Sequence, residues 1–304
     1  MRVLVTGASG LLGSDLFQAL HDRFELIGWA HQAPRWPAGW AANLEAVDLT
    51  DPAAVRKSLE RWKPAVVIHT AAMTDVDASE RDPDLVMRVN RDGTRAVAEA
   101  CDAVRAFLAA VSTDYVFDGT LDRPYREEDA PRPLGHYGRS KLAGEEAALT
   151  HCRRTLVVRV SGLFGRYRDN FVSTTASRLE AGEPVSAVTD QVYSPSYTVD
   201  LAEGFGRILA EYQRDSAAAE PGGRLHGFLH LSNAGGASRV EVAEWVAERV
   251  QAPVSLIRRC RWADLKRPAP RPAQTTLDCG RYRHLTGVDL RSWKEAIRVF
   301  LEEP

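Results

Sequence analysis

The sequence predicts an α/β protein of the Rossmann type, in which helices cover both faces of a doubly wound parallel sheet. Short aliphatic runs alternate with helical patterns five times in the first half of the chain. A glycine-rich turn joins the first run, residues 2–6, to the first helix. That run is β-branched and aliphatic, as expected of a buried strand. After residue 165 the rhythm changes, which indicates a smaller C-terminal α/β lobe.

The expected elements follow from these periodicities. Strands are expected at 2–6, 24–30, 44–47, 65–69, 107–111, 156–160, 184–188, 228–231 and 254–257. Helices are expected after residue 10 and at 55–62, 83–103, 137–148, 170–181, 199–212, 238–250 and 292–301. We therefore expect a dinucleotide-binding domain at 1–165 and a mainly substrate-binding lobe at 166–304, whose segments can interleave with the first domain.

Composition excludes several classes of function. The chain has 304 residues, of which 44% are hydrophobic and 26% charged, and a net charge of −2. This balance gives no reason to expect a nucleic-acid or membrane partner. The start of the chain is too short and too rich in glycine for a signal peptide, and no apolar run could cross a bilayer, so we expect a cytoplasmic protein. The four cysteines are far apart, so idle thiols are expected rather than a metal site.

The first strand and helix are joined by a turn with the spacing G-x-x-G-x-x-G. Gly7 permits the sharp turn, Gly10 lets the backbone approach a pyrophosphate, and Gly13 lets the helix pack on the strand. The free N–H groups of the helix N-terminus then face the phosphates. The alternative is a plain turn without a ligand. We predict cofactor contacts from Gly7, Gly10, Leu11, Leu12 and Gly13.

The second strand gives an indication of cofactor choice. No Asp or Glu follows it, whereas NAD-binding folds often place an acid there on the ribose hydroxyls. His31 and Arg35 follow instead and could hold a 2′-phosphate, which favours NADPH over NADH. The alternative is that both side chains face water.

Later strand ends supply further candidate contacts, because open α/β sheets bind ligands at the carboxyl ends of their strands. Asp48, followed by Leu49, could accept a hydrogen bond from an adenine amino group or cap the next helix. Ala71 and Ala72 form a turn of small residues, at which the backbone could approach a cofactor. Asn90 falls inside a helical pattern, where an asparagine usually faces solvent or bends the helix.

Tyr137 and Lys141 carry the predicted chemistry. One helical turn apart, they lie on the same helix face. A phenol has a pKa near 10, and an adjacent positive charge lowers it toward the range useful for proton transfer. Thr113, at the end of the fifth strand, is positioned to bond a substrate oxygen beside Tyr137. Taken alone, the Y-x-x-x-K spacing favours an exposed helical turn, and only the other motifs support a catalytic pair.

Several motifs together resemble the extended short-chain dehydrogenase/reductases, and within them the dTDP-4-dehydrorhamnose reductases. They cover nearly the whole chain in order: T-G-A-S-G-L-L-G at 6–13, A-A-M-T-D-V-D at 71–77, V-N-R-D-G-T at 89–94, S-T-D-Y-V-F-D-G at 112–119, Y-G-R-S-K-L-A-G-E at 137–145, D-Q-V-Y-S-P at 190–195 and R-P-A-P-R-P-A-Q-T-T-L-D at 267–278.

The resemblance implies an NAD(P)H-dependent reductase of a nucleotide-linked 4-keto-6-deoxysugar, monomeric or homodimeric. It implies that Tyr137 protonates the keto oxygen, Lys141 bonds the nicotinamide ribose and Thr113 holds the keto oxygen. It places Thr74, Val76 and Tyr115 near the sugar and Asn90 near the catalytic centre, among the cofactor contacts.

The chain departs from the family pattern at two places. Gly162 stands where the deoxysugar reductases often carry a tryptophan, which leaves the identity of the sugar open. The family's magnesium-linked dimer uses glutamates; Asp15 could match one, but Val199 stands at another, so we predict no metal. The arginines of segment 267–272 could clamp a diphosphate or lie in solvent.

Two other functions remain compatible with the motifs. One is a nucleotide-sugar epimerase or dehydratase, although dehydratases usually place an acid pair after the threonine, and here Tyr115 follows Asp114. The other is an NADP-binding regulatory subunit resembling that of methionine adenosyltransferase, which also lacks the tryptophan.

Overall fold

The protein is described here from a computed structural model, which describes residues 1–30 and 43–302. Seven parallel strands form the central sheet in the order β11-β6-β5-β4-β1-β2-β3. They are β1 (Arg2–Thr6), β2 (Glu25–Trp29), β3 (Leu44–Glu45), β4 (Val66–His69), β5 (Phe107–Thr113), β6 (Thr155–Val160) and β11 (Gly227–His230). This order confirms the predicted doubly wound sheet.

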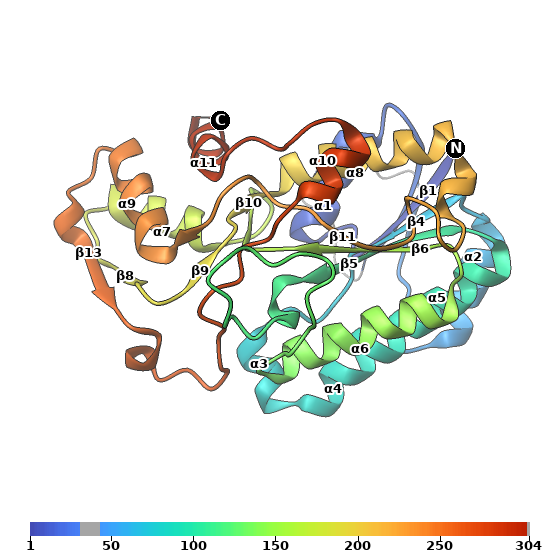
Figure 1. Cartoon of the computed structure of the whole chain (residues 1–304), viewed down its shortest axis with the longest axis horizontal. Coiled ribbons are helices and arrows are strands. Elements are labelled where there is room, and N and C mark those ends of the chain that lie inside the picture. Colours follow the sequence, from blue (N-terminus) through green and yellow to red (C-terminus); the bar gives the residue numbers. More distant parts are fainter. Residues whose placement is uncertain (31–42, 303–304) are drawn as a thin grey trace.

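Helices cover both faces of this sheet (Figure 1). One face carries α1 (Leu11–Leu20), α8 (Thr198–Arg214) and α10 (Gly280–Thr286), and the other carries α2 (Pro52–Trp62), α5 (Gly93–Val104) and α6 (His136–His151). Alternate residues of one strand enter opposite cores: Val3 and Val5 pack with α1 and α8, whereas Leu4 packs with α2 and α5. Burial on both faces explains why the strands are apolar throughout.

A smaller lobe lies beside the sheet (Figure 1). It contains α7 (Phe171–Glu180), α9 (Arg239–Arg249) and α11 (Trp293–Glu302), with the parallel pair β8 (Val185–Val188) and β13 (Ile257–Cys260). Short pairs join it to the rest: β7 (Leu163–Phe164) with β10 (Ser196–Tyr197), and β9 (Val192–Tyr193) with β12 (Ala237–Ser238). A separate apolar core underlies this lobe.

Two expected elements differ from the structure. The strand expected at 228–231 is present as β11, and it joins the main sheet beside β6 although it belongs to the second half of the chain. The strand expected at 254–257 begins only at Ile257, because residues 254–256 form a 3₁₀ turn. The single helix expected at 83–103 is α4 (Pro83–Met87), a π-helical turn (Arg88–Asp92) and α5, preceded by the short helix α3 (Val76–Arg81).

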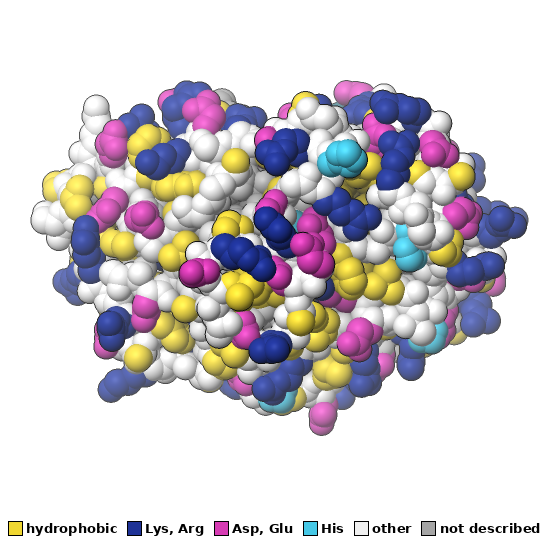
Figure 2. Space-filling model, in the orientation of Figure 1, with side chains coloured by type: hydrophobic (Ala, Val, Ile, Leu, Met, Phe, Trp, Pro, Cys, Tyr) yellow, Lys and Arg dark blue, Asp and Glu magenta, His cyan; other side chains and the backbone are white. Residues whose placement is uncertain are grey.

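Basic and acidic side chains are interspersed on the face shown in Figure 2, and neither sign dominates an area of it. Among the described residues, no helix is long and apolar enough to cross a membrane.

Candidate active site

The glycine turn has the geometry that its spacing predicts. Gly7 has φ +65°, and a Cβ there would lie 2.9 Å from the backbone of Ala71. A Cβ on Gly13 would lie 2.2 Å from the carbonyl oxygen of Gly7, so only glycine lets α1 pack this close to the turn. Gly10 caps α1 without a side-chain hydrogen bond, which leaves the first N–H groups of the helix available to an anion.

A cavity of about 710 Å³ opens at the carboxyl edge of the sheet. Its volume lies within the usual range for pockets that hold cofactors and small substrates. It gathers fifteen of the residues predicted from the sequence: Gly7, Gly10, Leu11, Leu12, Gly13, Asp48, Leu49, Ala71, Ala72, Thr74, Val76, Thr113, Tyr115, Tyr137 and Lys141. The glycine turn therefore shares one cavity with the tyrosine and lysine, as a dinucleotide site next to a reaction centre requires.

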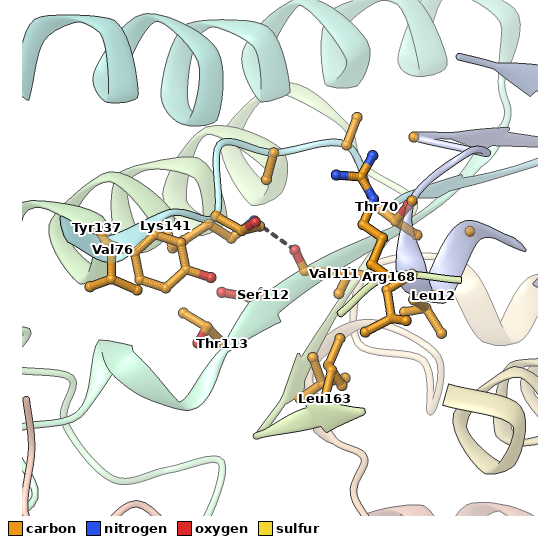
Figure 3. A pocket seen from close by; sticks show the side chains of 18 of the residues that line it. Leu12, Thr70, Val76, Val111, Ser112, Thr113, Tyr137, Lys141, Leu163 and Arg168 are labelled. Carbon is orange, nitrogen blue, oxygen red and sulfur yellow. Dashed lines mark hydrogen bonds between the residues drawn. The ribbon is translucent and has the colours of Figure 1, made fainter. Parts of the chain in front are cut away.

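Tyr137 and Lys141 lie on the first turns of α6, which begins after Gly135. The Lys141 ammonium donates a hydrogen bond to the carbonyl oxygen of Val111 on β5, at 2.8 Å. The side chain of Thr113, two residues further along β5, lies near Tyr137 and lowers the pKa of its phenol. Figure 3 shows the Tyr137 hydroxyl directed toward Ser112 and Thr113. A helix and a neighbouring strand thus bring the three predicted catalytic side chains together.

The structure corrects the expectation that Lys141 sets the pKa of Tyr137. Exclusion of water around the phenol raises the pKa of Tyr137 well above its usual value, and the largest opposing effect comes from the nearby Thr113 side chain. Burial also lowers the pKa of Lys141 to about 8, because the charged ammonium loses hydration. At neutral pH Tyr137 therefore holds its proton firmly, which is the state that a proton donor needs.

Asp114 follows Thr113 and ties three segments together beneath the cavity. Its carboxylate accepts hydrogen bonds from Thr275 at 2.6 Å, from Ser161 at 2.8 Å and from Thr113 at 3.1 Å. Burial raises the pKa of Asp114, and these three bonds oppose the rise. The reactive end of the cavity therefore depends on residues 161 and 275, which no local motif links to residue 114.

Asn90 is a correction to the sequence analysis. It is buried, not solvent-facing, because the π-helical turn directs its side chain inward. Its amide accepts from the Met73 N–H at 2.9 Å, donates to the Met73 carbonyl at 3.0 Å and donates to the Ser140 hydroxyl at 2.9 Å. The side chain is therefore engaged with protein groups rather than lining the cavity, and it fixes the 71–74 loop against α6.

The arginines of segment 267–272 have an acidic partner. Arg267 and Arg271 both pair with Asp77, at 3.2 and 3.3 Å, and neither is among the residues that line the cavity. The guanidinium carbon of Arg271 also lies 5.7 Å from the ring centroid of Tyr115, which does line it. The two other candidate cations, His31 and Arg35, lie outside the described residues.

Several cavity residues of the smaller lobe received no role from the sequence: Arg168, Asp169, Asn170, Phe171, Val172, Tyr193 and Arg239. Tyr193 belongs to the motif at 190–195, and this motif is the feature of the sequence that could have indicated a role for it. Gly162 has φ +54°, and a Cβ there would lie 2.2 Å from the Tyr193 ring. At the place of the expected tryptophan, the structure therefore brings in an aromatic ring from another segment.

The cysteines form no disulfides: Cys101, Cys152, Cys260 and Cys279 are free. Within residues 1–30 and 43–302, no three His, Cys, Asp or Glu side chains are grouped as a metal site would require.

The parallel sheet, the glycine turn and the tyrosine–lysine pair on α6 define a protein of the extended short-chain dehydrogenase/reductase class. More specifically, the chain belongs to the family described as the RmlD substrate binding domain, whose model matches residues 1–304.

Curated relatives and solved structures agree with this assignment. The chain is 39% identical over 298 residues to a dTDP-4-dehydrorhamnose reductase of Streptomyces griseus, covering 97% of this chain and 91% of that protein. It is 36% identical over 299 residues to a probable dTDP-4,6-dihydroxy-2-methyloxan-3-one 4-ketoreductase of Streptomyces antibioticus, covering 98% and 94%. A crystal structure of dTDP-4-dehydrorhamnose reductase from Bacillus anthracis in complex with NADP matches with a TM-score of 0.88 and 30% identity, covering 100% and 99%.

Proposed function

We propose that this chain is an NAD(P)H-dependent reductase of a dTDP-linked 4-keto-6-deoxysugar, converting dTDP-4-dehydro-L-rhamnose to dTDP-L-rhamnose. The observation that carries the proposal is the convergence of Thr113, Tyr137 and Lys141 in one cavity with the glycine turn. Relatives named dTDP-4-dehydrorhamnose reductase, which match nearly the whole chain, support the substrate class.

The residues would divide the chemistry between them. Bound NAD(P)H supplies the hydride for the carbonyl carbon. Tyr137 donates its hydroxyl proton to the ketone oxygen, and Thr113 orients that oxygen by a hydrogen bond. Lys141 would bind the ribose of the nicotinamide half and supply a positive charge there. The balance is one ketone, one NAD(P)H and one proton converted to one alcohol and one NAD(P)⁺.

The remaining contacts follow the geometry of the cavity. The glycine turn with Leu11 and Leu12 would hold the cofactor diphosphate, and Asp48, Leu49, Ala71 and Ala72 would line the path toward its adenosine half. Thr74, Val76 and Tyr115 would contact the sugar. Residues of the lobe that we assign to 166–304, among them Tyr193 and Arg239, would complete this side of the cavity.

We also propose a preference for NADPH over NADH. Two observations support it: β2 ends at Trp29 without an acid at its carboxyl end, and the Bacillus anthracis relative was solved with NADP. Titration with each reduced cofactor, followed by nicotinamide fluorescence, tests this preference. Equal or tighter binding of NADH would contradict it.

A second candidate substrate is supported by one relative. The 36% identical protein of Streptomyces antibioticus is named for reduction of dTDP-4,6-dihydroxy-2-methyloxan-3-one. Gly162 stands in place of the expected tryptophan and the Tyr193 ring lies against it, so the contact offered to the sugar there differs from that of the deoxysugar reductases.

The direct test of the proposed function is NADPH consumption at 340 nm with each dTDP-keto-sugar, using Tyr137→Phe as the matched inactive variant. The proposal expects turnover with dTDP-4-dehydro-L-rhamnose and little with the variant. No consumption with either keto-sugar would refute it.

A further inference from the structure

The cavity contains two cations without an acidic partner. Among the described residues that line it, the positively charged side chains are Lys141, Arg168 and Arg239. Lys141 is committed to the carbonyl of Val111. In the described part of the chain, neither arginine forms an ion pair with a carboxylate. An arginine that faces a ligand cavity and has no acidic partner is suited to bind an anionic group of the ligand.

Arg168 lies on the cofactor side of the cavity. Its loop is fixed to α1, the helix that follows the glycine turn, because the Tyr167 hydroxyl donates to the side chain of Gln18 at 3.0 Å. The side-chain amide of Asn170 donates to the Arg168 carbonyl at 3.0 Å, which holds the loop backbone in place. The guanidinium is therefore presented by a tethered loop rather than by a free one.

The direction of the Arg168 side chain agrees with this position. Figure 3 shows it pointing into the cavity toward Leu12 and Thr70, which flank the glycine turn. A Cβ on Gly165, three residues earlier, would lie 3.1 Å from a methyl carbon of Leu11, so the loop packs directly on the start of α1. The unsatisfied N–H groups of α1 and the guanidinium thus face the same space.

Arg239 lies in the smaller lobe. It is the first residue of α9, and its guanidinium carbon is 4.7 Å from the ring centroid of Phe171 and 5.1 Å from that of Tyr193. Both rings line the cavity. Stacking on two rings orients a guanidinium while leaving its N–H edge available for hydrogen bonds. Ser238 and Glu241 form a capping box that fixes this helix start.

Arg239 is also close to the reaction centre. The Tyr193 ring on which it stacks lies against Gly162, just after β6, while Thr113 ends the neighbouring strand β5. Its positive charge acts on Tyr115, which lines the cavity beside Tyr137. In a nucleotide sugar, the diphosphate is attached at C1, across the sugar ring from C4. A ketone at Tyr137 therefore places the diphosphate one ring away, on the side where Arg239 lies.

We propose that the two arginines divide two diphosphates between them: Arg168 binds the diphosphate of the nicotinamide cofactor, and Arg239 binds the diphosphate of the nucleotide-sugar substrate. This inference rests on the proposed function for the identity of the two ligands. Two dianions held in one cavity repel each other, so each needs its own cation. Arg168 and Arg239 belong to different segments: Arg239 is held against the rings of Phe171 and Tyr193, whereas Arg168 points toward Thr70 beside the glycine turn.

The test is a crossed binding experiment on the full-length chain with Arg168→Gln and Arg239→Gln. NADPH and NADH are titrated by nicotinamide fluorescence, and TDP is titrated by calorimetry with NADP⁺ at saturation. We expect Arg168→Gln to weaken both reduced cofactors equally, by about 10- to 100-fold, and to leave TDP binding within about twofold. We expect the reverse for Arg239→Gln, with weaker TDP binding and unchanged cofactor binding.

Matched controls exclude a general effect of removing positive charge. Arg166→Gln changes an arginine of the same loop that lies over the Phe300 ring and does not line the cavity. Arg249→Gln changes the far end of α9, where the guanidinium stacks on Trp245. Both controls should leave all three dissociation constants unchanged. Arg239→Lys should recover part of the TDP affinity, because it keeps the charge but loses the planar donor edge.

Several results would overturn the assignment. If Arg168→Gln weakened NADPH much more than NADH, the guanidinium would bind the 2′-phosphate and not the diphosphate. If each variant weakened both classes of ligand, or neither, the division would be wrong. Failure of the wild-type chain to bind TDP would overturn the role of Arg239.

Turnover separates this inference from the proposed function. A wild-type chain that binds both ligands with the crossed pattern, yet reduces no keto-sugar, would support the assignment and refute the reductase. If the wild-type chain reduces the keto-sugar but both variants bind NADPH and TDP as tightly as the wild type, the reductase is supported and the assignment of the two arginines is refuted.

Discussion

The two ends of the cavity are encoded in different ways. The phosphate-binding turn at the cofactor end comes from one continuous stretch, β1, the glycine turn and α1, within residues 2–20. The substrate end is assembled from the segments around residues 114, 162, 193, 239 and 275, which meet only in the folded protein. The difference explains why a short motif identifies the cofactor site, whereas the substrate contacts follow only from the three-dimensional structure.

Tyr137 lies where the two ends meet, and its substitution should have the largest effect. Tyr137→Phe removes the proton donor while keeping the ring that lines the cavity. We expect kcat to fall by about 10²- to 10⁴-fold, with the dissociation constant of NADPH nearly unchanged. Steady-state kinetics and fluorescence titration measure the two quantities. A variant that kept more than a tenth of wild-type kcat would remove Tyr137 from the chemistry.

The helix that carries Tyr137 and Lys141 depends on a buried ion pair outside the Y-x-x-x-K motif. Glu145 on α6 pairs with Arg159 on β6 through bonds of 2.9 and 2.7 Å, and both side chains are only 1% exposed. Glu145→Gln would leave a buried guanidinium without its counter-charge. We expect the free energy of unfolding to fall by about 3–5 kcal/mol in urea denaturation.

Glu146→Gln is the matched control, because Glu146 is the exposed neighbour on the same helix. It should change stability by less than about 0.5 kcal/mol. Equal effects of the two substitutions would show that the buried pair does not support the helix that carries Tyr137 and Lys141.

The pH dependence of cofactor binding sharpens the role of Lys141. Burial lowers the pKa of Lys141 to about 8, so its positive charge is present below that pH and is lost as pH rises through it. The affinity for NADPH should therefore be constant from about pH 6 to 7.5 and then fall by up to about tenfold per pH unit above pH 8. Lys141→Met should bind weakly at all these values, with no such break. An unchanged break in that variant would assign it to another group.

The smallest effect is expected at Arg267, on the substrate side. Its pair with Asp77 spans 3.2 Å, and the arginine side chain is 58% exposed. Arg267→Gln should cost less than about 1 kcal/mol of stability and leave TDP binding unchanged. Thermal unfolding and calorimetry check both quantities. A tenfold loss of TDP affinity would restore the diphosphate clamp that the sequence suggested for this segment.

Much of the fold follows from local patterns. The strands from β1 to β6 are apolar because the sheet is buried on both faces, so their positions could be predicted to within a few residues. The placement of β11 could not, because a short apolar strand carries no information on its neighbour. The break between α4 and α5 also could not be predicted, since the hydrogen bonds of Asn90 with Met73 and Ser140 join segments that are distant in the sequence.

In the functional site, too, some features can be predicted from local sequence patterns and others cannot. Spacing alone predicts the glycine turn and the tyrosine–lysine pair, because each depends on residues close in sequence. The low pKa of Lys141 and the high pKa of Tyr137 arise from burial, which no local pattern reports. Arg239 is positioned by the rings of Phe171 and Tyr193, which are distant from it in the sequence. Its neighbours in the sequence therefore give no indication that it binds a ligand.

The central claim is that Tyr137 protonates a ketone while hydride reaches the carbon beside it. The most direct measurement is the fate of deuterium from NADPH labelled at the nicotinamide C4 position, incubated with dTDP-4-dehydro-L-rhamnose and followed by mass spectrometry and NMR. We predict one deuterium at C4 of the product sugar for each NADPH consumed, and none with Tyr137→Phe over the same time. Deuterium that stays on the cofactor, or that reaches the sugar equally well in the variant, would contradict the account.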